Sequence, residues 1–243
     1  MTDTKKIALV TGANKGIGLE IARQLAEAGI VVLMGVRSLE RGQNAARELA
    51  DAGLHVEAIR IDLDDEASIA SAAELISSRY DRLDVLVNNA GILDAEDGPP
   101  TVASTAAVRR TMATNFLGTL AVTQAMLPLL RSSPAGRIVN LSTTLGSLSI
   151  NGDPTSPYYE ARLLGYNASK AALNMLTVQL AAELRDTPIA VNAVAPGYVR
   201  TDLTGGRGFL TPAEGARLPV EYALLGDDAV SGRFVEPQGA VPW

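Results

Sequence analysis

Short apolar runs alternate with amphipathic segments along the whole chain. In the runs, apolar residues follow one another without a break, which is typical of strands buried on both faces. In the amphipathic segments, apolar residues recur at every third or fourth position, the spacing of a helix with one buried face. This pattern predicts strands at 7–10, 30–36, 56–61, 84–87, 137–141, 189–194 and 233–235. It predicts helices at 16–28, 39–52, 66–79, 108–130, 166–184 and 212–224.

The order of these elements predicts the fold class. Strands that alternate with helices form a parallel sheet, and right-handed crossovers place helices on both of its faces. We therefore predict an α/β fold, a doubly wound Rossmann sheet of about seven strands. Since no linker, repeat or low-complexity segment interrupts the pattern, residues 1–243 are expected to form one domain. Ligands of such sheets bind at the carboxyl ends of the strands, where we look for candidate chemistry.

Composition and charge exclude several classes of function. The chain has 243 residues, of which 47% are hydrophobic and 20% charged, as in ordinary globular proteins. Its net charge of −6 argues against nucleic acid as a partner. The absence of cysteine excludes disulfides, thiol catalysis and cysteine-ligated zinc. With His55 as the only histidine, neither a Ser-His-Asp hydrolase nor a metal site is predicted.

The apolar stretches are too short or too polar for a membrane protein. The polar start at 1–6 and the brief run at 7–10 do not form a signal peptide. The most apolar long segment, 112–130, contains Asn115, Gln124 and Pro128 and is interpreted as a buried helix. We expect no membrane partner and, by default, a cytoplasmic protein.

A glycine-rich loop, TGANKGIG at Thr11–Gly18, joins the first predicted strand to the first helix. Glycine permits a tight turn and a close approach of the backbone, and the free N–H groups at a helix start bind phosphate. The strand–loop–helix context predicts a site for the pyrophosphate of a dinucleotide. A P-loop is excluded, because Lys15 precedes Gly16 and no Gly-Lys-Ser/Thr follows.

The end of the second predicted strand favours NADP(H) over NAD(H). NAD sites often place an acidic residue there, but this strand ends in Val36 followed by Arg37. Arg37 and Lys15 offer two cations to a 2′-phosphate, although either one alone would be interpreted as a solvated surface charge. Asp62 ends the third strand, where it reaches an adenine amine or serves as a helix N-cap or turn residue.

Tyr166 and Lys170 lie four positions apart in YNASK, so on a helix they share one face. A neighbouring ammonium stabilises a phenolate, which makes a tyrosine usable as a proton donor and acceptor near neutral pH. Ser142 follows a predicted strand, and we expect its hydroxyl to point into the same cleft. Asn115 sits inside a predicted helix, where asparagine is a poor helix former, so we expect a bend or a water site.

Taken together, these motifs resemble the short-chain dehydrogenases/reductases, and the resemblance spans nearly the whole chain. The glycine spacing differs from the TGxxGxxG of the epimerase-like branch, which would need glycine at Lys15. The enoyl-reductase branch would need tyrosine where this chain has Leu163. The residues that match, in the family's order, are TGxxxGxG at Thr11–Gly18, NNAG at Asn88–Gly91, Asn115, Ser142, YxxxK at Tyr166–Lys170 and the pair Pro196-Gly197.

The resemblance implies that the protein reduces a ketone or aldehyde with NADPH. Tyr166 would donate a proton to the carbonyl oxygen of the substrate, and Ser142 would hydrogen-bond that oxygen. Lys170 would bind the hydroxyls of the nicotinamide ribose and lower the pKa of the tyrosine. Asn115 would hold a water that relays protons from solvent.

The predicted cofactor contacts combine the glycine loop, the strand ends and the family's motifs. The NNAG stretch would line the adenosine ribose, or would instead brace the central sheet. Val199 and Thr201 would hold the carboxamide of the nicotinamide. The full predicted set is Gly12, Asn14, Lys15, Gly16, Ile17, Gly18, Arg37, Asp62, Leu63, Asn89, Ala90, Gly91, Tyr166, Lys170, Pro196, Gly197, Val199 and Thr201.

Segment 143–165 departs from the family's pattern. It separates Ser142 from Tyr166 by a wider gap than is usual, so we interpret it as an insertion at the mouth of the active site. Carbonyl reductases and their plant relatives carry a longer insertion here and share the NKGIG wording, which makes them the nearest subgroup. In that subgroup the insertion covers a helix face that other members use to dimerise. The sequence therefore leaves open whether the protein is a monomer or a homo-oligomer.

Tyr158 and Tyr159, inside the insertion, are rival candidates for the catalytic tyrosine. Four positions after them stand Arg162 and Leu163, so only Tyr166 has its lysine. We interpret the two tyrosines as apolar walls or gates of the substrate pocket. The segments expected to form that pocket are rich in Leu, Ile, Pro and Tyr, which predicts a largely apolar substrate; they are 94–100, 143–165 and the stretch after Pro196.

Two other functions stay open. The same residues would serve an NADP-dependent alcohol dehydrogenase, because equilibrium and cofactor ratios set the direction of the reaction. A dinucleotide-binding sensor without turnover would tend to lose Tyr166 or Lys170, and the complete acid–base set favours chemistry. The sequence thus predicts an NADPH/NADP+-dependent oxidoreductase that acts on a small-molecule carbonyl or alcohol.

Overall fold

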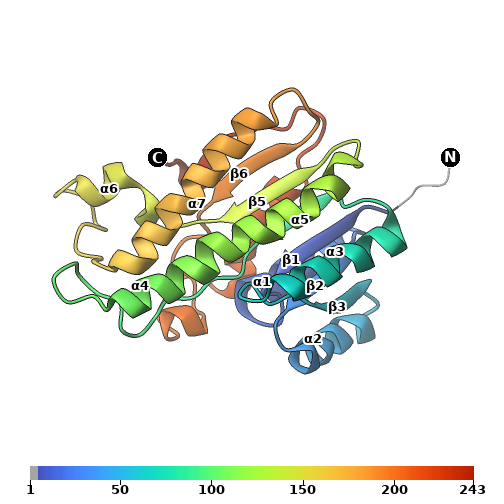
Figure 1. The fold of residues 1–243 in the computed structure, drawn as a ribbon, viewed down its shortest axis with the longest axis horizontal. Helices are drawn as coiled ribbons and strands as arrows, with labels where there is room; N and C mark the ends of the chain where they lie inside the picture. Colours follow the sequence, from blue (N-terminus) through green and yellow to red (C-terminus); the bar gives the residue numbers. More distant parts are fainter. Residues whose placement is uncertain (1–4) are drawn as a thin grey trace.

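A mostly parallel sheet lies at the centre of the computed structural model, which describes residues 5–243 (Figure 1). In these residues eight strands are ordered β3-β2-β1-β4-β5-β6-β7-β8. Neighbouring strands are parallel except for β7 and β8, which are antiparallel. The strands are β1 (Ile7–Thr11), β2 (Val31–Val36), β3 (Val56–Arg60), β4 (Val85–Asn88), β5 (Arg137–Leu141), β6 (Ala190–Val194), β7 (Phe234–Glu236) and β8 (Gly239–Ala240). The polar start at 1–6 lies partly outside the described residues.

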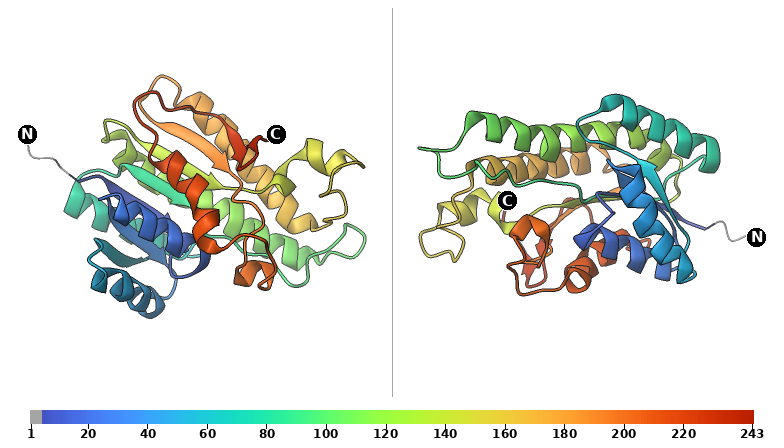
Figure 2. Two further views of the ribbon diagram at one scale, coloured as in Figure 1. Left: turned by 180° about the vertical axis from the view of Figure 1, so that it is seen from behind. Right: turned by 90° about the horizontal axis from the view of Figure 1, so that it is seen from below.

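Helices cover both faces of the sheet (Figures 1 and 2). Each face buries its own apolar cluster, and neighbouring strand residues such as Leu9 and Val10 belong to opposite clusters. One face carries α1 (Gly16–Glu27), α2 (Leu39–Asp51) and α8 (Pro212–Ala223). The other carries α3 (Glu66–Tyr80), α5 (Thr119–Arg131) and α7 (Leu164–Glu183). The doubly wound α/β fold predicted from the sequence is confirmed, with element ends shifted by a few residues.

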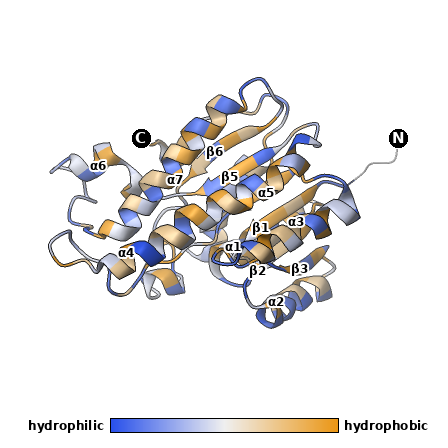
Figure 3. Ribbon diagram, viewed as in Figure 1, coloured by the Kyte–Doolittle hydropathy of each residue, from blue (hydrophilic) through white to orange (hydrophobic). Residues whose placement is uncertain are grey.

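Burial on both faces explains why the central strands lack alternation. Every residue of β1, β4, β5 and β6 is buried. A strand covered by helices above and below must be apolar at both parities, and Figure 3 shows largely hydrophobic strands between helices with hydrophilic outer faces. The predicted count of about seven strands missed β8, because two residues carry no periodic signal.

The long helix predicted at 108–130 is interrupted by one wider turn. It consists of α4 (Thr105–Met112), the π-helical segment η1 (Ala113–Gly118) and α5. Asn115 lies inside η1, so the expected irregularity takes the form of a π turn. The helix Thr105–Arg131 is long and apolar enough to cross a membrane, yet it packs against α3 and α7 inside the fold, as expected for a core helix.

The insertion at 143–165 contains two short helices that the sequence pattern did not predict. They are the 3-10 helix η2 (Thr144–Gly146) and the helix α6 (Leu148–Gly152), followed by turns. Ile150 of α6 packs against a small apolar cluster that includes Phe234 and Val241. In Figure 1 the insertion projects beyond the start of α7 rather than lying along that helix. A further 3-10 helix, η3 (Asp202–Thr204), follows β6.

Candidate active site

The glycine loop lies against the NNAG stretch at the carboxyl edge of the sheet. Gly12 and Gly16 adopt the left-handed conformation, with φ of 66° and 58°, which side chains disfavour. A Cβ at Gly18 would overlap the side-chain amide of Asn89 and the carbonyl of Gly12. Asn89 Nδ2 donates to the carbonyl oxygens of Thr11 and Gly12 at 2.8 and 3.2 Å. The loop is therefore held in one shape by the end of β4.

The N-terminus of α1 is left open by the protein itself. Its N-cap residue, Lys15, provides no side-chain acceptor, and no acidic residue stands in the first turn. By contrast, Ser38, Asp65 and Thr211 accept hydrogen bonds at the starts of α2, α3 and α8. Free N–H groups and the positive end of the helix dipole make such a terminus a binding site for an anion. The shape of the loop and this terminus fit the predicted pyrophosphate.

Cations gather beside that open terminus. Arg37 is exposed after β2 and makes no ion pair among residues 5–243. Lys15 lies in the wall of a cavity of about 350 Å³ together with Arg41, which the sequence reasoning missed. Arg41 lies on the first turn of α2, shortly after Arg37, and this proximity in the sequence could have indicated it. Lys15 is ion-paired with Asp202 of η3, so the expected free cation is already partnered.

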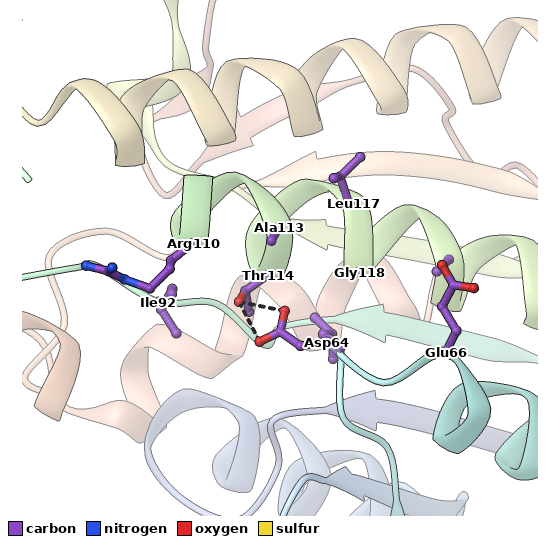
Figure 4. A pocket seen from close by; sticks show the side chains of 10 residues that line it. Asp64, Glu66, Ile92, Arg110, Ala113, Thr114, Leu117 and Gly118 are labelled. Carbon is purple, nitrogen blue, oxygen red and sulfur yellow. Dashed lines mark hydrogen bonds between the residues drawn. The ribbon is translucent and has the colours of Figure 1, made fainter. Parts of the chain in front are cut away.

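Asp62 and Leu63 form a turn between β3 and α3. Asp62 Oδ1 accepts the N–H of Asp64 at 3.3 Å, and the N-cap of α3 is Asp65, so of the two structural alternatives the turn is correct. Leu63 lines a groove of about 410 Å³ along the long helix, shown in Figure 4. In this groove Thr114 donates to the carboxylate of Asp64. Neither Tyr166 nor Lys170 lines it, so the groove flanks the candidate active site.

The NNAG stretch braces the sheet. Asn88 Nδ2 donates to Asn140 Oδ1 at 2.8 Å, and Asn140 Nδ2 donates to Thr177 Oγ1 of α7 at 2.9 Å. These buried amides link β4, β5 and α7 in one row. Of the two roles predicted for the stretch, the bracing role is present in the structure, and contact with the cofactor stays a prediction.

Asn115, Gly91 and Lys170 meet although they come from three separate motifs. Asn115 Nδ2 donates to Ser169 Oγ at 3.0 Å, and its Oδ1 accepts the N–H of Ile92 at 2.7 Å. A Cβ on Gly91 would lie 3.3 Å from Asn115 Oδ1 and 3.6 Å from Lys170 Nζ. The π turn thus ties the long helix to the loop after NNAG and to α7. The water site predicted at Asn115 stays a prediction.

Tyr166 and Lys170 lie one turn apart on α7. Lys170 Nζ donates to the carbonyl oxygen of Leu141 at 2.7 Å and lies 5.8 Å from the centre of the Tyr166 ring. Burial raises the pKa of Tyr166 to about 12 and lowers the pKa of Lys170 to about 8. Desolvation is the cause of both shifts, and the Lys170 ammonium is directed to the Leu141 carbonyl. The lowering of the tyrosine pKa by Lys170 stays a prediction.

Ser142 does not present its hydroxyl as expected. It is buried, and its Oγ donates to Asn174 Oδ1 of α7 at 2.6 Å. The next residue, Thr143, is only partly buried, and its extended backbone turns its side chain away from that of Ser142. Thr143 Oγ1 accepts the N–H of Leu145 at 3.3 Å, which leaves its proton for another acceptor. Sequence reasoning missed Thr143 because it considered only the first hydroxyl after the strand.

The segment after β6 folds back over the glycine loop. Gly197 has φ of 84°, and Thr201 Cγ2 would lie 3.5 Å from a Cβ on Gly16. Val199 is buried and packs against Gly215 of α8, so any contact it makes with a cofactor falls to its backbone. Thr201 is thus brought to the predicted site, next to the open start of α1.

The two tyrosines of the insertion differ in their surroundings. The guanidinium of Arg162 lies 4.6 Å from the centre of the Tyr159 ring, a cation–π contact. Tyr158 is 39% exposed. The role predicted for both, as walls or gates of the pocket, stays a prediction.

Known proteins share this fold and these motifs. The family model described as short chain dehydrogenase matches residues 6–208. The short-chain dehydrogenase anuI of Penicillium roqueforti is 37% identical, over 98% of this chain and 96% of its own. Carbonyl reductase (NADPH) 1 of Mus musculus is 35% identical, with 100% of both chains covered. NADPH-bound carbonyl reductase from chicken fatty liver has a TM-score of 0.85 at 29% identity, over 98% of this chain and 99% of that chain. The chain belongs to the short-chain dehydrogenase family.

Proposed function

We propose that the protein is an NADPH-dependent reductase of a ketone or aldehyde. The observation that carries this proposal is the meeting of Lys170, Asn115 and Gly91 at the sheet edge that also holds the open start of α1. When bound, NADPH supplies the hydride. The chain's own residues have to bind that cofactor, orient the carbonyl and provide a proton.

Three features support NADP(H) as the cofactor. Gly12 and Gly18 let the glycine loop pack closely against the end of β4, and the start of α1 keeps N–H groups that no side chain caps, as a pyrophosphate requires. Arg37 and Arg41 stand at the adjoining edge, where two guanidinium groups suit a 2′-phosphate. Relatives named for NADPH cover the full length of the chain. Lys15 joins this set once it leaves Asp202.

Tyr166 is the proposed proton donor. Its high pKa keeps the hydroxyl protonated near neutral pH, which is the form that a carbonyl reduction needs. Lys170, with a pKa near 8, still carries its charge there and stabilises the phenolate as it forms. We propose the Thr143 hydroxyl as the donor that holds the carbonyl oxygen. Ser142 takes that role only if it gives up its bond to Asn174.

The reverse reaction is the second candidate function. An NADP-dependent alcohol dehydrogenase would use the same tyrosine as a base, and equilibrium and cofactor ratios would set the direction. A sensor without turnover is a weaker hypothesis. Burial of the Lys170 ammonium beside Tyr166 costs folding free energy, and such groups are concentrated at catalytic sites.

The substrate is expected to be a small, largely apolar carbonyl compound. This follows from the Leu, Ile, Pro and Tyr residues of the insertion at 143–165. The cytoplasm stays the expected compartment. The oligomeric state also stays open: Leu117 and Met175, each 55% exposed, are not covered by the insertion.

One screen tests the proposal directly. Purified protein is mixed with NADPH and a panel of ketones, aldehydes and quinones, and the loss of NADPH absorbance is followed. At least one apolar carbonyl compound should be reduced, with NADH much less effective. If no member of the panel is reduced, the proposed function is wrong.

Arg37→Asp tests the cofactor half of the proposal. The substitution removes a cation from the 2′-phosphate and supplies an acid that can bind a ribose 2′-hydroxyl. The ratio of kcat/KM with NADPH to that with NADH should fall by roughly tenfold to a hundredfold, as expected for a lost charge-assisted bond. Arg47→Asp, on the exposed side of α2, is the matched control and should leave the ratio unchanged.

A further inference from the structure

The first turn of α7, which carries Tyr166, is capped from a distant part of the chain. Its own N-cap residue, Leu163, has no side-chain acceptor. Instead, the Asp97 carboxylate accepts the N–H of Gly165 on Oδ1 at 2.9 Å and the N–H of Tyr166 on Oδ2 at 2.8 Å. The Gly98 carbonyl accepts the N–H of Leu164 at 3.0 Å. Two consecutive residues thus satisfy three free N–H groups at the start of the helix.

Asp97 is itself held firmly by its surroundings. Its Oδ1 also accepts the N–H of Gly98 at 2.8 Å. Arg110 of α4 forms ion pairs with Asp94 at 2.7 Å and with Glu96 at 2.8 Å, which fixes the loop to the long helix. The segment 94–98 is therefore an ordered part of the structure at the point where it meets α7.

Gly165 makes room for this carboxylate. A Cβ at position 165 would lie 3.1 Å from Val108 Cα and 3.3 Å from Asp97 Oδ2. Both contacts are tighter than ordinary van der Waals distances. The absence of a side chain immediately before Tyr166 thus lets α4, the loop and α7 come together.

A cap from a distant segment connects two parts of the fold, whereas a local cap does not. Elsewhere among residues 5–243, Ser38, Asp65, Ser104 and Thr211 cap the helices that directly follow them. Such residues stabilise a helix but tie it to nothing else. The cap of α7 also fixes the position of segment 94–98 relative to the backbone of Tyr166. On the other side of the same turn, Asn167 Nδ2 donates to Asn151 Oδ1 of the insertion at 2.9 Å.

We propose that Asp97 is a positioning residue for Tyr166. It couples the loop expected to border the substrate to the helix turn that carries the proton donor, so that substrate and hydroxyl keep a fixed relation. This proposal rests on the proposed function. Reaction rates are sensitive to such relations, because a displacement of about 1 Å can slow catalysis roughly a hundredfold.

Three variants test the proposal. Asp97→Ala removes the acceptors for Gly165 and Tyr166 and should lower kcat by roughly tenfold to a hundredfold. Asp97→Asn keeps one oxygen and should fall between Ala and the unchanged chain. Asp94→Asn is the matched control, since it removes an ion pair from the same loop but makes no bond to α7. In all three the Kd for NADPH should stay within about twofold, because none of these residues lies at the glycine loop.

Hydrogen exchange provides a readout that does not need turnover. The amides of Gly165 and Tyr166 should exchange faster in Asp97→Ala and at an unchanged rate in Asp94→Asn, because only Asp97→Ala removes their acceptors. Unchanged exchange in Asp97→Ala would refute the cap. A kcat in Asp97→Ala equal to that of the control, measured where both are folded, would refute the positioning role. A chain that never turns over would refute the proposed function and with it this role, whereas the exchange data would still decide the cap.

Discussion

The N-termini of α1 and α7 lack a local side-chain cap, but their free N–H groups have different surroundings. Both helices start at the carboxyl edge of the sheet, and neither Lys15 nor Leu163 supplies a side-chain cap. At α7 the Asp97 carboxylate accepts the first N–H groups. At α1 there is no acid in the first turn, and Lys15 and Arg41 lie beside it, with Lys15 paired to Asp202. The comparison indicates that the positive N-terminus of α7 is neutralised by a carboxylate, which fixes the turn that carries Tyr166. We propose that the start of α1 instead receives the pyrophosphate of the cofactor.

The largest effect on kcat is expected from Tyr166, the proposed proton donor on α7. Tyr166→Phe removes the proposed proton donor but no group at the glycine loop. We expect kcat to fall roughly a thousandfold, within the usual range for general acid catalysis, while the Kd for NADPH is unchanged. Single-turnover kinetics and NADPH fluorescence titration measure the two quantities. A variant that retains most of its activity would mean that another residue provides the proton.

A carboxylate placed at the N-terminus of α1 should make it resemble the capped N-terminus of α7. Lys15→Asp places a carboxylate at the N-cap of α1, where it would accept the first-turn N–H groups as Asp97 does at α7. We expect the Kd for NADPH to rise roughly a hundredfold, from the competing carboxylate and the lost cation. The control, Lys15→Gln, removes the charge without supplying a carboxylate and should cost much less. Equal effects of the two variants would show that charge alone matters there.

A second pair of variants distinguishes a hydroxyl that stabilises the contact with α7 from one that contacts the substrate. Thr143→Val removes the hydroxyl proposed to hold the carbonyl oxygen and should lower kcat by roughly tenfold to a hundredfold, with little change in stability. Ser142→Ala should instead lower the free energy of unfolding by about 1–3 kcal/mol, because the buried Asn174 loses its donor. Kinetics and urea unfolding on both variants decide the matter. The opposite pattern would restore Ser142 as the catalytic hydroxyl.

The smallest effect is a pH dependence that originates at α7. Since burial lowers the pKa of Lys170 to about 8, the positive charge beside Tyr166 is lost as pH rises through that value. We expect kcat/KM for carbonyl reduction to be level near pH 7 and to fall about tenfold per unit above pH 8. Tyr166, with a pKa near 12, stays protonated throughout this range.

The pH dependence of stability distinguishes this loss of activity from unfolding, because the contribution of Lys170 to stability changes in the opposite direction. The unfolded chain binds a proton at Lys170 up to about 10.5, so between about 8 and 10.5 it holds more protons there than the folded chain. Stability from this group therefore rises with pH while activity falls. Lys170→Arg should shift the fall in activity to higher pH. A profile that keeps its midpoint in this variant would assign the fall to another group.

Much of the site could be predicted because its motifs are local. Gly12, Gly16 and Gly18 lie within one loop, and Tyr166 and Lys170 share one helix face, so their spacing, together with the other motifs, indicated them. The alternation of runs and amphipathic segments was enough for the fold, since burial on both faces dictates the composition of each central strand.

The remainder depends on contacts between distant segments. Nothing in the sequence around Leu163 indicates that Asp97 caps the helix, because capping signals are read from neighbouring residues. The choice between Ser142 and Thr143 depends on which face of β5 meets α7. Because every residue of β5 is buried, the apolar pattern does not distinguish the two faces. The raised pKa of Tyr166 comes from desolvation, which spacing in the sequence does not determine.

The π turn at Ala113–Gly118 makes the site sensitive to single-residue deletions. A π turn holds about one residue more than an α-helical turn, so it sets the rotational phase between the two halves of the long helix. Deleting one residue there would restore regular hydrogen bonding and rotate one half by about 100° relative to the other. Either Met126 would leave the core or Arg110 would leave Asp94, and Asn115 could no longer reach both Ile92 and Ser169. In this segment, chain length constrains the protein as strictly as residue identity.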